Sequence, residues 1–131
     1  MSDAPPPAAD ASHSRTLGIV DDDPAVLESL CFLLDVSGFT ATGFASAQDF
    51  LARYTLGSLA GLILDHHMPL ITGLELLARL RSNGDRVPVL LITGSPSPAI
   101  VARARTLGVE GVIEKPPLED ALLHFAATVA G

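Results

Sequence analysis

The stretch "LAGLILDHHMP", residues 59–69, places an almost uninterrupted apolar run directly before Asp65. A strand that is covered on both faces, as in a parallel sheet between helices, has a continuous apolar run instead of an alternating one. We therefore predict a buried parallel strand over residues 59–65. The carboxylate at its end, taken alone, is compatible with a turn, a metal site or a nucleophile, and other parts of the chain must distinguish these.

The rest of the chain from Thr16 onward repeats a short apolar run followed by a capped segment of helical periodicity. The other strands are predicted at TLGIV (residues 16–20), FTATGF (39–44), VPVLLIT (87–93) and GVI (111–113). Helices are predicted to follow the caps Asp23, Ser46, Thr72 and Ser97, with capping boxes at Ser46–Asp49 and Thr72–Glu75, and a last helix over residues 118–129. Five strands alternating with five helices predict a flavodoxin-like, doubly wound α/β fold with strand order 2-1-3-4-5.

The helical periodicity also predicts which side chains are buried. The second helix carries the apolar side chains Phe50, Leu51 and Tyr54. In the third helix Leu74, Leu77 and Leu80 should form a buried stripe.

Composition and charge limit the classes of function. The 131 residues are 48% hydrophobic and 18% charged, which is typical of one globular domain. A net charge of −7 with only eight Lys and Arg residues argues against direct binding of nucleic acid and favours a cation or a basic partner. Cys31 is the single cysteine, so we expect neither an internal disulfide nor a cysteine-based metal cluster.

The first 15 residues differ in character from the remainder. They are rich in Pro, Ala and Ser and lack the basic start and apolar centre of a signal peptide, so we predict a flexible tail over residues 1–15 and a folded domain over 16–131. No apolar stretch approaches the roughly 18 residues that a membrane span requires. We therefore expect a soluble, cytoplasmic protein.

Polar residues follow four of the predicted strands. Asp21 and Asp22 follow the first strand, Asp65 ends the third, Thr93 ends the fourth and Lys115 follows the fifth. In doubly wound sheets ligands bind outside the carboxyl ends of the strands, so these side chains should converge. Two like charges about 4 Å apart repel by about 4 kcal/mol at an effective dielectric constant of about 20. The acidic cluster therefore favours a divalent cation, and its oxygen ligands favour Mg²⁺ or Mn²⁺.

Thr93 and Lys115 would complete such a site with a hydroxyl and a fixed positive charge. Both groups suit the oxygens of a transferring phosphoryl group. Lys115 is the only lysine in the chain, and its compact ammonium group fits a phosphate oxygen as a point charge. Asp23 is assigned to the helix cap in preference to the metal site.

Four motifs together resemble a known family. They are "IVDDDPAVLESL", "LILDHHMPLITGLELL", "VPVLLITG" and "VIEKP", in which the steps from Asp22 to Asp65, Thr93 and Lys115 are 43, 28 and 22 residues. In these motifs, from about Leu17 to Ala130, the chain resembles the receiver domains of bacterial two-component response regulators. The resemblance implies a signalling domain, not an enzyme, capable at most of self-phosphorylation from small phosphodonors and of autodephosphorylation.

The resemblance also implies a role for each site residue. Asp65 would accept a phosphoryl group from a histidine kinase or phosphotransfer protein, and Thr93 and Lys115 would sense the phosphorylated state. Mg²⁺ would be held by Asp21, Asp22, Asp65 and the backbone carbonyl of His67. A cis peptide bond is implied before Pro116.

The chain departs from the family pattern at two places. Val112 stands where the family usually carries an aromatic residue on the fifth strand, so rotation of a ring there cannot report phosphorylation. His66 and His67 follow Asp65, and the second of these positions influences the loss of phosphate in the family. We hypothesise that His67 shields or orients the attacking water; the alternative is a pair of solvated loop histidines. A zinc site made by the pair is not expected.

Two other functions are compatible with parts of the sequence. "DDDPAV" also resembles the first motif of haloacid-dehalogenase-type phosphohydrolases, with Asp21 as nucleophile and Asp23 as acid. That interpretation leaves Asp65 without a role and lacks a later acidic pair at a strand end, because Glu119 and Asp120 begin a helix. The other alternative is a pseudo-receiver, an interaction module that is not phosphorylated.

The sequence leaves open which partner, other than the phosphodonor, the domain binds. A downstream protein or a missing output domain would receive the signal, since the closest motifs are those of receivers that precede a helix-turn-helix domain. Phosphorylation-dependent dimerisation through the fourth helix, fifth strand and fifth helix is common in the family. Exposed charges at Arg103, Arg105, Glu119 and Asp120 are candidates for such an interface.

Overall fold

The computed structural model describes residues 15–131. The strands are β1 (Thr16–Val20), β2 (Thr40–Phe44), β3 (Gly61–Asp65), β4 (Val89–Thr93) and β5 (Gly111–Glu114). The helices are α2 (Pro24–Val36), α3 (Ala47–Arg53), α4 (Gly73–Ser82), α5 (Pro98–Thr106) and α6 (Glu119–Ala130). Apart from Arg15, the predicted tail of residues 1–15 lies outside the described residues.

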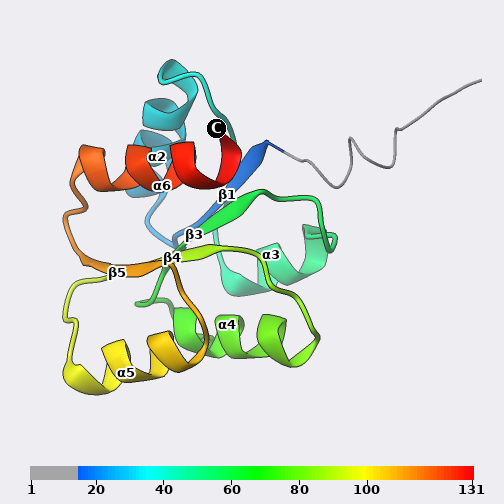
Figure 1. Ribbon diagram of the computed structural model, residues 1–131, viewed down its shortest axis with the longest axis vertical. Helices are drawn as coiled ribbons and strands as arrows, with labels where there is room; N and C mark the ends of the chain where they lie inside the picture. The colour runs from blue at the N-terminus through cyan, green and yellow to red at the C-terminus, as the bar shows by residue number, and fades with distance from the viewer. Residues whose placement is uncertain (1–14) are drawn as a thin grey trace, which may run out of the picture.

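The five strands form one parallel sheet in the order β2-β1-β3-β4-β5, which confirms the predicted topology. Helices α2 and α6 cover one face of the sheet, and α3, α4 and α5 cover the other (Figure 1). β3 and β4 begin two residues later than the apolar runs suggested. At β4 the later start is due to Pro88, which has no N–H to donate to a neighbouring strand. Only its carbonyl bonds to the sheet, where it accepts from the N–H of Leu62 at 2.8 Å.

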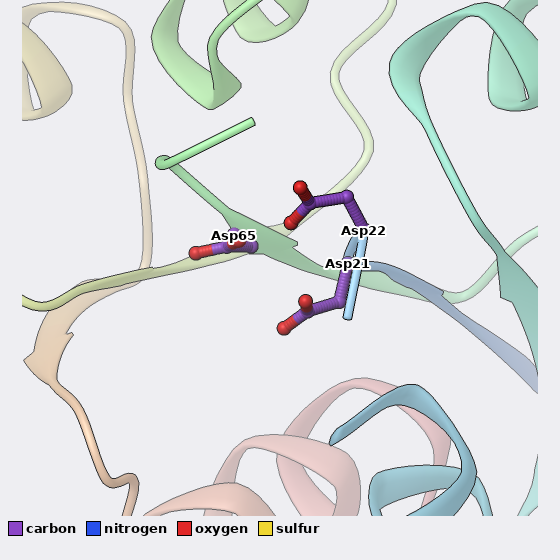
Figure 2. Close-up of side chains that lie close together, drawn as sticks. All are labelled: Asp21, Asp22 and Asp65. Carbon is purple, nitrogen blue, oxygen red and sulfur yellow. The ribbon is translucent and has the colours of Figure 1, made fainter. Parts of the chain in front are cut away.

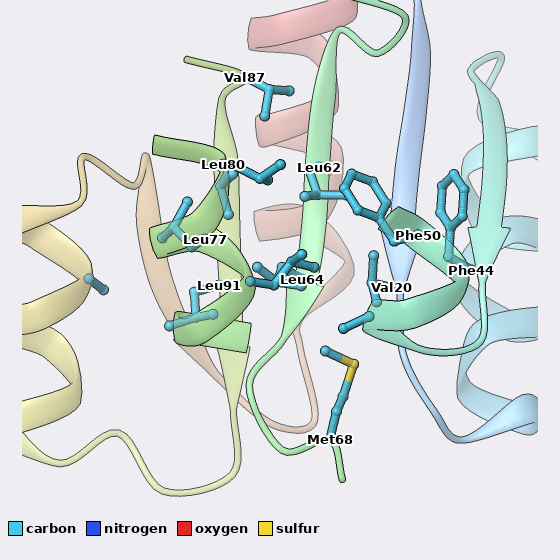
Figure 3. Close-up of a cluster of buried hydrophobic side chains, with 14 residues drawn as sticks. Val20, Phe44, Phe50, Leu62, Leu64, Met68, Leu77, Leu80, Val87 and Leu91 are labelled. Carbon is cyan, nitrogen blue, oxygen red and sulfur yellow. The ribbon is translucent and has the colours of Figure 1, made fainter. Parts of the chain in front are cut away.

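Each face of the sheet has its own hydrophobic core. Leu62 and Leu64 of β3 belong to the core under α3, α4 and α5, together with Phe50 and Met68 (Figure 3). Ile63, between them, belongs to the core under α2 and α6. Since successive side chains of a strand point to opposite faces and both faces are covered, β3 is buried at every residue. Burying each of the apolar side chains Leu62, Ile63 and Leu64 contributes about 1.5–3 kcal/mol.

Helix caps explain where several helices begin. The Oδ1 atom of Asp23 accepts from the N–H groups of Ala25 and Val26 at 3.0 and 3.4 Å, so this carboxylate is the cap of α2. Thr72 and Glu75 form both bonds of the predicted capping box at α4. These local hydrogen bonds satisfy N–H groups that have no partner inside the helix.

The capping box predicted at Ser46 and Asp49 is only half formed. Ser46 Oγ accepts from the Asp49 N–H at 2.9 Å. The Asp49 carboxylate, however, accepts from the N–H of Ala45 and from two nitrogens of Arg53, both at 2.9 Å. The pairing with Arg53 one turn later holds the carboxylate away from the backbone of Ser46, which corrects the prediction.

The predicted buried stripe of α4 is only partly buried at Leu74, and one apolar residue of α3 faces outward. Leu51 is 39% exposed, because it is adjacent to the buried Phe50 and faces about 100° away from it around a short helix. In α4 the fully buried residues include Leu76 and Leu77, whereas Leu74 is only half-buried against the same core. None of the helices within residues 15–131 has the length and apolar character needed to cross a bilayer.

Candidate functional site

The strand register brings the predicted site residues to one edge of the sheet. Val20 pairs with Leu64, so Asp21 and Asp65, each one residue further along, lie at the same level. Asp65 pairs with Ile92 on β4, and Thr93 follows it. Thr93 in turn pairs with Glu114, the residue before Lys115. The predicted convergence is therefore found, and it follows from the common direction of the strands.

Three carboxylates form the acidic part of this edge. Each of Asp21, Asp22 and Asp65 offers one oxygen, and these oxygens lie within 4.8 Å of one another (Figure 2). Asp21 and Asp65 are each 2% exposed, whereas Asp22 is exposed. The Oδ2 atom of Asp65 is buried and has no hydrogen-bond partner in the described structure. Leaving a buried charged oxygen unpaired is costly, and carboxylate oxygens are ligands of hard divalent cations. The cluster can thus hold a metal ion.

Lys115 faces the two buried carboxylates. Its Nζ atom lies 3.0 Å from Asp65 Oδ1 and 3.7 Å from Asp21 Oδ2. Burial disfavours the charged ammonium, but the hydrogen bond to Asp65 and the charges of Asp21, Asp65 and Asp22 outweigh it and raise the pKa of Lys115. The backbone N–H of Lys115 donates to the Thr93 carbonyl at 2.9 Å, and the bond to Pro116 is cis, as the resemblance implied.

Asp21 is held in an unfavourable environment for its charge. Burial is the largest cause that raises the pKa of this carboxyl, and the charge of Asp65 acts in the same direction. The Asp23 N–H, which donates to Asp21 Oδ1 at 2.9 Å, and the charge of Lys115 oppose this shift without cancelling it. A cation between the carboxylates would favour their charged forms.

Thr93 and His67 make a contact that sequence reasoning missed. Thr93 is fully buried, and its Oγ1 atom lies 2.7 Å from His67 Nε2 and accepts from the Ser95 N–H at 3.2 Å. The backbone N–H of His67 reaches Asp65 Oδ1 at 3.3 Å. No local pattern signals the ring contact, because the two residues are 26 positions apart.

The neighbouring His66 has a different role. Its Nδ1 atom accepts from the N–H of Leu74, in the first turn of α4, at 3.4 Å. Burial, followed by the nearby His67, lowers the pKa of His66. Within residues 15–131 the group of potential metal ligands is the aspartate trio, which does not include either histidine.

Gly73 shapes the loop that carries Asp65, and sequence reasoning did not single it out. A Cβ atom at this position would lie 2.5 Å from the Asp65 carbonyl oxygen and 2.8 Å from the Cα atom of His66. The Gly73 N–H also donates to the His66 carbonyl at 3.0 Å. α4 therefore packs directly on the backbone of the site, which requires a residue without a side chain.

Known proteins match both the sequence and the structure. The family model of the response regulator receiver domain matches residues 17–127. The chain is 38% identical over 104 residues to the transcriptional regulatory protein FixJ of Bradyrhizobium diazoefficiens. The aligned segment covers 79% of this chain and 51% of FixJ. It is 34% identical over 113 residues to the response regulator protein TodT of Pseudomonas putida, covering 86% of this chain and 50% of TodT. The chain thus spans about half the length of these curated relatives.

Solved structures agree with these matches. The crystal structure of FixJ-N has a TM-score of 0.77 at 31% identity, covering 88% of this chain and 92% of that chain. The response regulator StyR has a TM-score of 0.81 at 33% identity, covering 88% of this chain and 58% of that chain.

The doubly wound sheet, the acidic cluster at its carboxyl edge and these relatives define a signalling domain of the phosphoacceptor class. The chain belongs to the response regulator receiver domain family.

Three structural observations also favour a receiver domain over a phosphohydrolase. Asp23, the acid in the phosphohydrolase interpretation, is engaged as the cap of α2. Lys115 lies closer to Asp65 than to Asp21, the nucleophile of that interpretation. Glu119 and Asp120 are exposed in the first turn of α6, away from a strand end.

Proposed function

We propose that residues 16–131 form a receiver domain that accepts a phosphoryl group on Asp65 and signals by a change of conformation. The observation that carries the proposal is the environment of Asp65: Oδ1 contacts the Lys115 ammonium at 3.0 Å, and the buried Oδ2 has no hydrogen-bond partner in the described structure. A buried carboxylate oxygen with no hydrogen bond retains its lone pairs for attack on phosphorus.

The proposed donor is a phosphohistidine of a histidine kinase or of a phosphotransfer protein. An Asp65 carboxylate oxygen attacks the phosphorus atom, an O–P bond forms, the N–P bond breaks, and the imidazole of the donor leaves with the bonding electron pair. The product on Asp65 is an acyl phosphate. Lys115 and the Thr93 hydroxyl would interact with the oxygens of the transferred group, since charge on these oxygens needs positive or hydrogen-bonding partners.

We further propose that Asp21, Asp22, Asp65 and the backbone carbonyl of His67 would hold Mg²⁺. When bound, the ion supplies positive charge to the phosphoryl oxygens. The fit is supported by the three carboxylate oxygens within 4.8 Å of one another.

Partners and assembly are part of the proposal. Because the match spans only about half of FixJ and half of TodT, a downstream protein or an output domain beyond this sequence would receive the signal. Dimerisation would use α5, β5 and α6, where Arg103, Arg105, Glu119 and Asp120 are exposed. The domain itself would catalyse at most its own phosphorylation from small phosphodonors and its own dephosphorylation.

The central test is incubation with Mg²⁺ and acetyl phosphate followed by intact mass spectrometry. We expect one base-labile phosphate on the wild-type protein and on the control Asp35→Asn, which changes an exposed carboxylate of α2. Asp65→Asn should take up none. A folded wild-type protein that remains unmodified would support the pseudo-receiver, and steady release of phosphate that depends on Asp21 would support the phosphohydrolase.

A further inference from the structure

The hydroxyl of Thr93 connects the end of β4 to the loop after β3. Thr93 is fully buried, and its Oγ1 atom contacts His67 Nε2 at 2.7 Å and the Ser95 N–H at 3.2 Å. On the neighbouring strand β5, Val112 has a half-buried side chain without a polar atom. The ring of His67 is therefore the side-chain partner of this hydroxyl.

His67 also contacts the proposed phosphorylation site. Its backbone N–H reaches Asp65 Oδ1 at 3.3 Å, while its ring reaches Thr93. One residue thus touches both the group that would be modified and the hydroxyl that would respond. Because the two contacts use different parts of the residue, a change at Thr93 can move the ring while the backbone stays in place.

We propose that His67 is a positioning residue that couples Thr93 to the state of Asp65. Its ring holds the Thr93 hydroxyl when Asp65 is unmodified and is released when the hydroxyl turns to a phosphoryl oxygen. This inference rests on the proposed phosphorylation of Asp65.

The physical reason is competition for a single hydroxyl. A threonine side chain occupies one rotamer at a time, so its hydroxyl cannot stay beside the ring and also turn to a phosphoryl oxygen. A hydrogen bond to an ionised phosphoryl oxygen is roughly twice as strong as one between neutral groups. The hydroxyl of Thr93 therefore leaves the ring for the phosphoryl group when one is present.

Release of the ring has a consequence at the surface. His67 is exposed, so reorientation of its ring changes the surface of the loop between β3 and α4. His66 does not share this response, because its ring is bonded to the first turn of α4 through the N–H of Leu74. The loop is thus one part of the surface that reports the state of Asp65.

The test is nuclear magnetic resonance of histidine rings labelled with ¹⁵N and ¹³C, with beryllofluoride and Mg²⁺ as the phosphoryl mimic and at one pH throughout. In the wild-type protein the His67 Nε2 resonance should move when the mimic binds. Thr93→Val should place this resonance at the released position without the mimic and abolish the response to it, whereas Thr93→Ser should respond like the wild type. Thr93→Ala, which adds no volume, repeats the test if the valine variant folds poorly.

The His66 ring serves as the internal control for the added charge, and it should move by the same amount in wild type and Thr93→Val. A His67 resonance that stays unchanged on binding, or moves equally in Thr93→Val, overturns the inference. Binding itself is followed by backbone amide shifts, which should not change in Asp65→Asn. Absence of any amide shift in the wild type would overturn the proposed function, and this inference with it.

Discussion

The ammonium group of Lys115 lies 3.0 Å from Asp65 Oδ1, although 50 residues separate the two in the sequence. Their contact crosses β4, which lies between β3 and β5 in the sheet. The same ammonium group lies 3.7 Å from Asp21, so one cation faces two buried carboxylates. The rate of phosphorylation at Asp65 and the stability of the fold should both depend on these contacts.

Lys115→Ala should slow self-phosphorylation from acetyl phosphate by about 100-fold, the size of effect seen when one preorganised electrostatic group is removed. Lys115→Arg should not restore the rate, because a planar guanidinium does not replace a compact ammonium as a point charge. The initial rate is measured by intact mass spectrometry, with Arg103→Ala on the exposed side of α5 as the control. A wild-type rate in Lys115→Ala would exclude a role for this residue in the transfer.

Asp21→Asn should stabilise the protein at neutral pH in the absence of divalent metal. Since burial and the Asp65 charge raise the pKa of Asp21, its charged form destabilises the folded state above that pKa. The gain in Tm should be about 4 °C, the shift expected for about 1 kcal/mol in a domain of this size. It should shrink as the pH falls through the raised pKa, where the wild-type carboxyl takes up a proton.

Calorimetry at several pH values tests this expectation, with Asp35→Asn at an exposed carboxylate of α2 as the control. Added Mg²⁺ should raise the Tm of the wild type more than that of Asp21→Asn. A lower Tm for Asp21→Asn than for the wild type at neutral pH would contradict the sign of the effect.

Gly73→Ala should destabilise the fold by about 1–3 kcal/mol, as overpacking of a tight contact does. The new methyl group would meet the backbone of Asp65 and His66 at 2.5 and 2.8 Å, so the loop must shift. Phosphorylation should become slower as the site is displaced. Chemical denaturation measures the loss, and Gly94→Ala is the matched control because a Cβ atom there meets nothing within 4 Å.

His67→Ala should accelerate loss of phosphate from Asp65 roughly tenfold, equivalent to about 1.4 kcal/mol in the barrier. The ring is exposed on the loop that directly follows Asp65, and after its release from Thr93 it can shield the acyl phosphate from water. Release of inorganic phosphate after removal of the donor gives the rate, with His66→Ala as the control. Slower loss would show that the ring orients the water, and an unchanged rate would remove both roles.

Tyr54→Phe should destabilise the fold by about 1–3 kcal/mol without affecting phosphorylation. The Tyr54 hydroxyl donates to Asp85 Oδ2 at 2.6 Å, and burial together with this bond raises the pKa of the tyrosine. The variant keeps the ring, which stacks on Phe50, but leaves the mostly buried Asp85 with one fewer partner. Chemical denaturation should therefore show a lower free energy of unfolding, whereas mass spectrometry should show an unchanged rate of phosphorylation.

Much of this molecule could be predicted from the sequence because the signals are local or follow from a regular sheet. The apolar run before Asp65 indicated a strand covered on both faces, and Asp23 and Thr72 marked helix starts that the structure contains. Parallel strands end at one edge, so the meeting of Asp21, Asp65, Thr93 and Lys115 followed from their positions at strand ends.

Other features were decided only by the tertiary structure. The bond between the His67 ring and Thr93, and the approach of Gly73 to the backbone of Asp65, depend on how loops and helix starts are placed in three dimensions. The capture of Asp49 by Arg53 and the outward direction of Leu51 depend on side-chain rotamers and helix rotation. Residue order specifies which strand end a side chain follows, whereas packing specifies which neighbouring atom it reaches, because angstrom-scale contacts arise only once the layers are assembled.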